Sequence, residues 1–154
     1  MLSKANKVAV VFASLSGSAQ RVAETLQQNL QSTLPSAEVE LLDMLVVNPE
    51  AFSQYDFIFM GASTYGDGDL NPFAEVFVAS MSGRESEKMW EGLPFAIFGL
   101  GDSSYVNFCS AADLLVDFAQ LHGGIVHQPI LKIDVLTQDW DQQEQMIREW
   151  SASF

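Results

Sequence analysis

The sequence has 154 residues, of which 48% are hydrophobic and 18% charged. That length and composition suffice for one independent core, so we expect a single domain over residues 1–154. Seven basic residues against twenty acidic ones give a formal net charge of -13. This excludes the basic face that nucleic acid requires and disfavours binding to an anionic membrane. It favours steering toward basic protein partners, although solubility alone is the alternative explanation.

Cysteine content and the N-terminal segment indicate the compartment. Cys109 is the only cysteine, so the chain forms no internal disulfide. Residues 1–7 are short and polar and show no signal-peptide pattern, and no apolar run has the length of a membrane span. We therefore expect a cytoplasmic protein.

Short apolar runs alternate with helical periodicity along the whole chain. The predicted strands cover residues 8–13, 39–42, 57–61, 95–99 and 125–133, the last interrupted by Pro129. Helices are predicted from Ala19 to near Pro35, after the Asn71 cap and Pro72, before Gly123 and Gly124, and after the Asp139 cap. The alternation predicts an α/β fold, a doubly wound five-stranded parallel sheet with helices on both faces. The order 2-1-3-4-5 suits five strands, but periodicity does not determine it.

Two details of this pattern concern packing. The helix after Asn71 is predicted to turn Phe73, Val76 and Phe77 inward. The polar stretch 82–92 is predicted to be a surface connection. Neither segment carries an internal repeat or a linker composition.

Three unusual loops follow predicted strands, at residues 14–19, 63–69 and 99–105. In an open parallel sheet, ligands bind outside the carboxyl ends of the strands, where the strand order reverses. The first loop places hydroxyls and Gly17 before a helix N-terminus, which favours an anion such as phosphate. It lacks the lysine of a nucleotide-triphosphate loop and the three-glycine dinucleotide motif. A serine-rich helix cap without a ligand is equally consistent with this loop alone.

The second and third loops each contain one tyrosine among glycine and small polar residues. Tyr65 and Tyr105 could enclose a planar aromatic ligand between them, because aromatic rings offer a large contact area and an electron-rich face. Each tyrosine considered by itself is more simply an ordinary loop aromatic. Their placement beside a phosphate-type loop favours a redox cofactor.

The segments Ser-Leu-Ser-Gly-Ser-Ala, Ser-Thr-Tyr-Gly-Asp-Gly-Asp and Gly-Leu-Gly-Asp-Ser-Ser-Tyr-Val-Asn-Phe-Cys resemble the three FMN-binding loops of the flavodoxin family. They occur in the family's order and span nearly the whole chain. The absence of an extra loop within residues 125–133 resembles the short-chain class. Tyr65 and the Gly-Asp-Gly-Asp segment after it also resemble the FMN domains of diflavin reductases.

The resemblance implies FMN as cofactor and a set of binding residues. The first loop would hold the phosphate with help from Ser63, the two tyrosines would flank the isoalloxazine ring, and residues 100–102 would line its pyrimidine side. The full implied set is Ser14, Leu15, Ser16, Gly17, Ser18, Ala19, Ser63, Thr64, Tyr65, Gly66, Asp67, Gly68, Leu100, Gly101, Asp102, Tyr105, Asn107, Phe108 and Cys109.

Two features of these loops bear on redox behaviour. Gly66 lacks a Cβ, so we hypothesise that the Gly66–Asp67 peptide changes conformation when the flavin gains one electron. Asp67, Asp69 and Asp102 would crowd negative charge around a reduced flavin that is itself negative. The second reduction potential is therefore expected to be low.

The sequence presents no nucleophile with a base and no metal-ligand spacing. His122 and His127 are predicted to be solvated or core residues, and Cys109 a small packed residue. The main hypothesis is a monomeric, low-potential electron carrier between a basic NADPH-dependent flavoprotein reductase and acceptor proteins. The alternatives are a flavin-dependent quinone or azo-compound reductase and an FMN domain or subunit of a diflavin-type reductase. A phosphoacceptor receiver domain is excluded, since Ser14 and Gly61 stand where it needs acidic residues.

Overall fold

The computed structural model describes residues 2–154 and contains one sheet with five parallel strands in the order β2-β1-β3-β5-β6. These strands are β1 (Lys7–Ala13), β2 (Glu38–Asp43), β3 (Phe57–Tyr65), β5 (Pro94–Gly101) and β6 (Ile125–Asp134). The two-residue strand β4 (Asp69–Leu70) pairs antiparallel with the end of β3. Counting only the parallel strands along the chain, the order is 2-1-3-4-5, so the predicted doubly wound sheet is confirmed.

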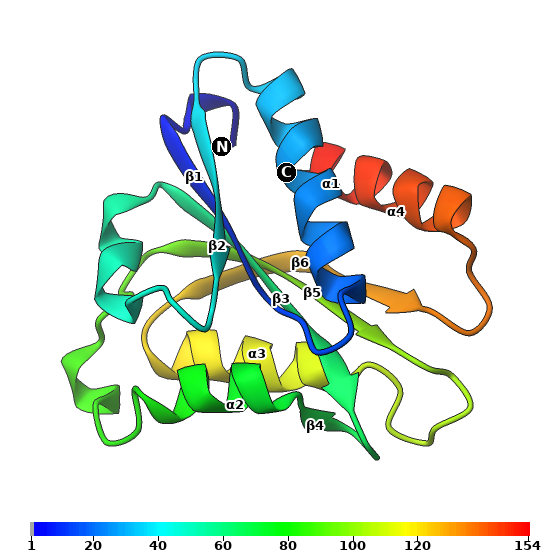
Figure 1. Ribbon diagram of the computed structural model, residues 1–154. Coiled ribbons are helices and arrows are strands. Elements are labelled where there is room, and N and C mark those ends of the chain that lie inside the picture. Colours follow the sequence, from blue (N-terminus) through cyan, green and yellow to red (C-terminus); the bar gives the residue numbers. More distant parts are fainter. Residues whose placement is uncertain (1) are drawn as a thin grey trace.

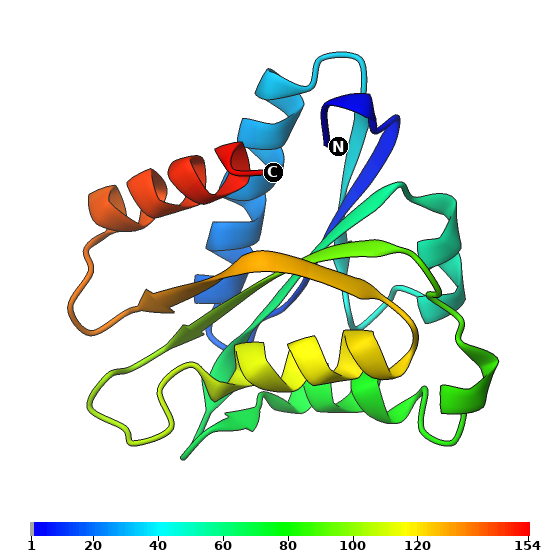
Figure 2. The same cartoon turned by 180° about the vertical axis from the view of Figure 1, so that it is seen from behind.

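Helices cover both faces of this sheet (Figures 1 and 2). Helices α1 (Ser18–Thr33) and α4 (Trp140–Ala152) lie together on one face, and α2 (Pro72–Ala79) and α3 (Ser110–Leu121) lie on the other. Three short 3-10 helices, η1 (Leu2–Lys4), η2 (Pro49–Gln54) and η3 (Glu85–Glu87), complete the connections. None of the helices in residues 2–154 has the length and apolarity needed to cross a bilayer.

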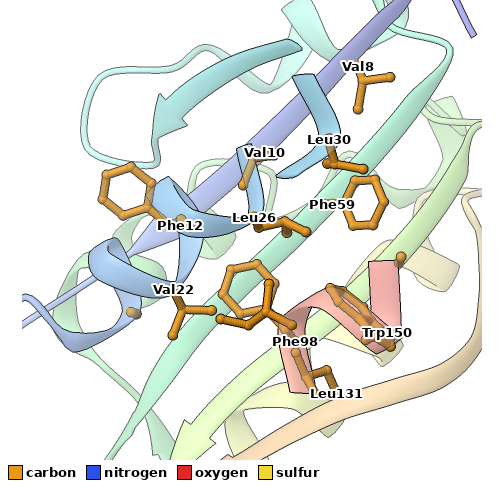
Figure 3. Close-up of a cluster of buried hydrophobic side chains, with 14 of the residues drawn as sticks. Val8, Val10, Phe12, Val22, Leu26, Leu30, Phe59, Phe98, Leu131 and Trp150 are labelled. Atoms are coloured by element: carbon orange, nitrogen blue, oxygen red, sulfur yellow. The ribbon is translucent and has the colours of Figure 1, made fainter. Parts of the chain in front are cut away.

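An apolar core lies between the sheet and each of its two helical layers. Beneath α1 and α4, Leu26 and Trp150 pack with side chains of the central strands, among them Val10, Phe59 and Phe98 (Figure 3). Strands β1, β3 and β5 are buried over most of their length because helices cover both of their faces. This explains why their sequences are continuous apolar runs without alternation.

The second core contains a residue from the predicted surface connection. Trp90 lies within 82–92 but is almost completely buried, and its ring stacks on Phe52 at 4.9 Å between centroids. Its indole Nε1 donates to the Pro49 carbonyl oxygen at 3.1 Å. The prediction was therefore wrong at Trp90, because one large aromatic in a polar segment can reach back into the core.

Helix α2 is rotated from the predicted orientation. Asn71 caps it as predicted, but Val76 is 66% exposed, while Ala74 and Phe77 are buried. The spacing of Phe73, Val76 and Phe77 fits an apolar helical face as well as the spacing of Ala74 and Phe77 does. The contact with the sheet decides between the two faces, so the prediction for Val76 was wrong.

Strand β6 continues through the predicted interruption at Pro129. Its pairing with β5 is irregular there, since Ala96 pairs with His127 and Phe98 pairs with Leu131. Pro129 lies within this irregular segment, and its preceding peptide bond is cis. A proline has no N–H to donate to a ladder, so an irregular position is where a strand accommodates it.

The second core also buries His122, which ends α3. Its ring packs edge-on against Trp90 at 5.6 Å and Phe118 at 5.1 Å, and its Nδ1 has no hydrogen-bond partner. Burial lowers the pKa of His122, since the interior disfavours the charged imidazolium, although the nearby Glu85 and Glu87 act in the opposite direction.

We expect His122→Leu to reduce the loss of stability on acidification. An unfolded histidine protonates near pH 6.5, whereas folded His122 resists protonation until lower pH. Its contribution to stability is therefore complete above about pH 6.5 and falls as the pH drops below that value. Denaturant unfolding at pH 7.5 and 5.5 should show a smaller difference for the variant than for the wild type.

Gln28→Leu, which replaces an exposed side chain on α1 that does not titrate, is the control and should retain the wild-type difference. Equal pH dependence of wild type and His122→Leu would contradict the assignment.

Candidate functional site

The loops that follow β1, β3 and β5 meet at one end of the sheet (Figure 1). They enclose a hollow of about 240 Å³. It is lined by Leu15, Ser16, Ser18, Ser63, Thr64, Tyr65, Gly66, Leu100, Gly101, Asp102, Tyr105, Asn107, Cys109 and Val135. All three predicted loops thus contribute to one site, as expected from the carboxyl ends of adjacent parallel strands.

The first loop presents neutral donors at the start of α1. Gly17 is the N-cap residue with a φ of 95°, and no side chain bonds the first N–H groups of the helix. The Ser14 hydroxyl accepts a hydrogen bond from the Gly17 N–H at 2.9 Å, which closes the loop. The Ser16 and Ser18 hydroxyls lie 3.5 Å apart at the rim. Free N–H groups with two hydroxyls suit a phosphate.

The second loop is held against the third by side-chain hydrogen bonds. Asn107 Nδ2 donates to the Asp67 carbonyl oxygen at 2.6 Å, and the Ser110 hydroxyl donates to the Gly68 carbonyl oxygen. Gly68 has a φ of 127°, and a Cβ there would lie 2.6 Å from the Asn107 Cβ. A glycine is therefore required where these two loops approach.

Two half-exposed tyrosines face the same hollow from different loops. Tyr65 is 51% exposed and Tyr105 is 50% exposed, and both line the hollow. Gly101 permits the third loop to fold back, since a Cβ there would lie 2.8 Å from the Cys109 nitrogen. Exposed aromatic rings flanking a shallow hollow suit a planar aromatic ligand.

Asn71, predicted only as a helix cap, also organises the site. Its Oδ1 accepts from the N–H groups of Phe73 and Ala74, both at 3.0 Å. Its Nδ2 donates to the Ala13 carbonyl oxygen at 3.0 Å and to the Ser63 Oγ at 3.1 Å. This buried side chain therefore joins the ends of β1 and β3 to α2.

Sequence reasoning missed Asp134, at the carboxyl end of β6. Its nearly buried carboxylate accepts from the Ser103 N–H at 3.1 Å, the Leu136 N–H at 3.0 Å and the Thr137 hydroxyl at 2.7 Å. These hydrogen bonds, led by those from Ser103, lower the pKa of Asp134 to about 2. Asp134 thus joins the third loop to the loop after β6, where Val135 also lines the hollow. An aspartate at the end of a predicted strand, near the position where the other strands lead into the site loops, was the available signal.

Cys109 lies at the floor of the site as a packed thiol. It is fully buried with a φ of 54°, and its Sγ donates to the carbonyl oxygens of Ile133 at 3.4 Å and Gly99 at 3.7 Å. Burial raises the pKa of Cys109 to about 12, so the thiol stays protonated. Neither histidine lines the hollow. Within residues 2–154 there is no group of three or more His, Cys, Asp or Glu residues placed to hold a metal ion.

Some predicted residues lie outside the lining of the hollow. Ser14, Gly17, Asp67 and Gly68 shape the loops through the contacts described above, and Phe108 is half-buried beside them. Ala19 is completely buried in the core beneath α1. The role of each in ligand binding stays a prediction.

The comparisons with known proteins agree with this geometry. The family model described as Flavodoxin matches residues 10–150. This chain belongs to the flavodoxin family. It is 32% identical over 139 residues to "Probable flavodoxin 2" of Bacillus subtilis (strain 168), covering 90% of this chain and 88% of that protein. The solved structure of oxidised Flavodoxin 2 from Bacillus cereus superimposes with a TM-score of 0.83 at 27% identity and covers 96% of both chains.

A longer protein also matches. The chain is 29% identical over 146 residues to the sulfite reductase [NADPH] flavoprotein alpha-component of Thiocapsa roseopersicina, covering 95% of this chain but 26% of that protein. Flavodoxins are FMN-binding electron carriers that work with redox partners, so the expected cofactor and carrier class are confirmed. Neither alternative, the flavin-dependent reductase or the diflavin-type FMN domain or subunit, is favoured.

The residues of this flavodoxin fit FMN at both ends of the cofactor. The uncapped start of α1 offers N–H donors for the phosphate, and the two exposed tyrosines offer faces for the flavin ring. Asp102 is the one charged residue among the described residues that line the hollow. Its carboxylate is engaged by the Ser104 N–H at 2.8 Å and the Ser104 hydroxyl at 2.6 Å.

We expect Asp134→Asn to loosen the third loop. An amide oxygen accepts more weakly than a carboxylate, and its NH₂ group cannot accept at all. Hydrogen exchange should be faster at the amides of Ser103 and Leu136 in the variant. Asp141→Asn, on the exposed side of α4, is the control and should leave both amides unchanged. Unaltered exchange in Asp134→Asn would show that the carboxylate does not hold the loop.

Proposed function

We propose that this flavodoxin holds one FMN in the hollow between Tyr65 and Tyr105 and passes single electrons between partner proteins. The observation that carries this proposal is the pair of half-exposed tyrosines beside an uncapped helix N-terminus. When bound, FMN accepts and releases electrons one at a time. The chain's residues bind it, orient it and leave part of the site open to a partner.

The first loop would hold the phosphate without a cation. Ser16 and Ser18 supply hydroxyls, and the first N–H groups of α1 supply donors and the positive end of the helix dipole. The Asn71 amide bonds the Ala13 carbonyl oxygen, directly before this loop, and the Ser63 hydroxyl. The phosphate's own charge would thus stay unpaired by Lys or Arg among the residues lining the hollow.

The charges near the flavin would make full reduction difficult. Asp102 lines the hollow, and the ionised Asp134 carboxylate bonds the Ser103 N–H of the same loop. Asp67 lies in the second loop, and Asp69 follows in β4, paired with Tyr65. Negative charge added to the flavin is opposed by these groups and by a chain of net charge -13. These observations support a low second reduction potential.

The surface supports docking of a basic protein at the open edge. An exposed apolar rim around the hollow is formed by Leu15, Tyr65, Tyr105 and Val135, and the residues that follow the last two, Val106 and Leu136, are also exposed. Several basic side chains elsewhere form ion pairs within the chain. Lys7 pairs with Glu40, Arg84 with Glu50 and Glu87, and Lys132 with Asp113. An apolar rim on an acidic protein suits a basic NADPH-dependent flavoprotein reductase as donor and basic acceptors.

We further propose that residues 1–154 form one FMN domain that acts as a monomer in the cytoplasm. The lone buried Cys109 supports a reducing compartment, since a single cysteine cannot form a disulfide within the chain.

The second candidate function is that of an FMN domain or subunit in a diflavin-type reductase assembly. It is motivated by the partial match to a sulfite reductase flavoprotein and by the resemblance of the Tyr65 loop, but the comparisons do not favour it over the freestanding carrier.

The visible spectrum of the purified protein with added FMN tests the cofactor site. We expect stoichiometric flavin absorbance after desalting. Tyr65→Leu and Tyr105→Leu should each weaken FMN binding by about tenfold, since a stacked aromatic pair contributes roughly 0.5–1.5 kcal/mol beyond area burial.

Leu121→Ala alters an exposed side chain at the end of α3 and should leave FMN affinity unchanged. A protein that stays colourless with excess FMN, or tyrosine variants with wild-type affinity, would overturn this assignment.

Gly66 provides a second test of the site. Its φ is 57°, and a Cβ there would meet no atom within 4 Å, so a substitution acts through the backbone alone. A β-branched residue disfavours this positive-φ conformation, so it changes the free-energy difference between the backbone conformations open to Gly66. We expect Gly66→Val to narrow the gap between the first and second reduction potentials in an anaerobic titration.

Gly83→Val is the control, because Gly83 also has positive φ and open space around it but lies outside the hollow. An unchanged gap in Gly66→Val would contradict a conformational role for Gly66.

A further inference from the structure

A second hollow of about 350 Å³ adjoins the proposed flavin site. It is lined by Tyr65, Asp69, Leu70, Pro72, Glu75 and Leu114, and we call it the α2 groove. Tyr65 lines both hollows, so its side chain is the wall between them. A ligand in the α2 groove would contact the same tyrosine that the flavin contacts.

Residues of regular secondary structure form the walls of the α2 groove. Tyr65 and Asp69 are directly opposite each other in the β3–β4 ladder, which places their side chains on one face. Glu75 lies in the first turn of α2, whose start is fixed by the buried Asn71. The two carboxylates and the tyrosine are thus positioned together before any partner arrives.

The α2 groove carries negative charge that no cation among its described lining residues compensates. Asp69 and Glu75 line it, and no Lys or Arg is among its lining residues. No described residue donates a hydrogen bond or forms an ion pair with either side-chain carboxylate. The other lining residues, Leu70, Pro72 and Leu114, are apolar, and Leu114 is 42% exposed. The α2 groove therefore presents acidic, aromatic and apolar side chains together.

We propose that the α2 groove receives an arginine side chain of a redox partner protein. This rests on the proposed carrier function, since it names a docking contact of that carrier. A guanidinium is planar, stacks on an aromatic face and bonds carboxylates through several N–H donors. A lysine ammonium satisfies the carboxylates but offers no planar face to Tyr65.

This contact would couple docking to the flavin. A guanidinium on Tyr65 places positive charge one aromatic ring away from the flavin site. It would oppose the negative charge of the surrounding carboxylates and favour the more reduced, more negative cofactor. Partner binding and electron acceptance would thereby favour each other, because such coupling is reciprocal.

Titration of the ¹⁵N-labelled protein with the blocked tripeptides Gly-Arg-Gly, Gly-Lys-Gly and Gly-citrulline-Gly tests the proposal. We expect Gly-Arg-Gly to perturb the amides of residues 65, 69–71, 73–75 and 114 and to bind at least about threefold more tightly than Gly-Lys-Gly. Citrulline has the arginine shape without the charge and should not bind. Equal effects of arginine and lysine, equal effects of arginine and citrulline, or shifts spread over the whole acidic surface would each overturn the proposal.

Paired variants locate the contact. Asp69→Asn with Glu75→Gln should weaken arginine binding about threefold to tenfold. Glu24→Gln with Glu149→Gln makes the same change in charge on α1 and α4, on the opposite face of the sheet, and should leave it unchanged. Tyr65→Leu should remove the preference for arginine over lysine. A preference that survives in Tyr65→Leu, or equal weakening by both double variants, would refute the α2 groove.

The titration is run with and without FMN, so the two proposals fail separately. A colourless protein that still selects arginine would overturn only the proposed cofactor site. A flavin-loaded protein without arginine selectivity would overturn only the α2 groove. Shifts at the groove that grow with protein concentration in the absence of peptide would identify a second copy of the chain as occupant and would also overturn the proposal.

Discussion

The buried side chain of Asn71 is the interaction on which the site depends. Its amide group donates to Ala13 at the end of β1 and to Ser63 near the end of β3, while its oxygen caps α2. A buried amide is costly unless its donors and acceptors are satisfied, and here both ends are. Three elements far apart in the sequence are therefore held in one arrangement, and the first two loops take their positions from it.

The third loop is held by a different set of contacts. Asn107 and Ser110 bond the carbonyl groups of the second loop, and Asp134 bonds the Ser103 N–H from the end of β6. The second and third loops are thus bonded to each other and to β6, and the first loop begins directly after Ala13, which Asn71 bonds. Such hydrogen bonds preorganise a ligand site, because the loops need not lose further freedom when the ligand binds.

Electrostatics give the molecule two distinct kinds of acidic group. Asp102 and Asp134 are engaged by N–H and hydroxyl donors and help to fix the loops. Asp69 and Glu75 have no such partners in the described structure and face a groove beside Tyr65. The first kind belongs to the architecture of the flavin site, whereas the second is free to meet a partner. Under the two proposals made above, one acidic surface would serve both the cofactor and a partner.

The sequence by itself determined the five parallel strands, the four α-helices that alternate with them, and the three loops of the site, but not β4 or the 3-10 helices. The continuous apolar runs at 8–13, 57–61 and 95–99 predict strands covered on both faces, which the two helical layers confirm. These are properties of local pattern. Tertiary structure alone decided the strand order, the burial of Trp90 and the outward turn of Val76. It also brought Asp134 to the third loop and placed the α2 groove behind Tyr65. These contacts join segments distant along the chain, so their geometry depends on how the layers pack and not on any local periodicity.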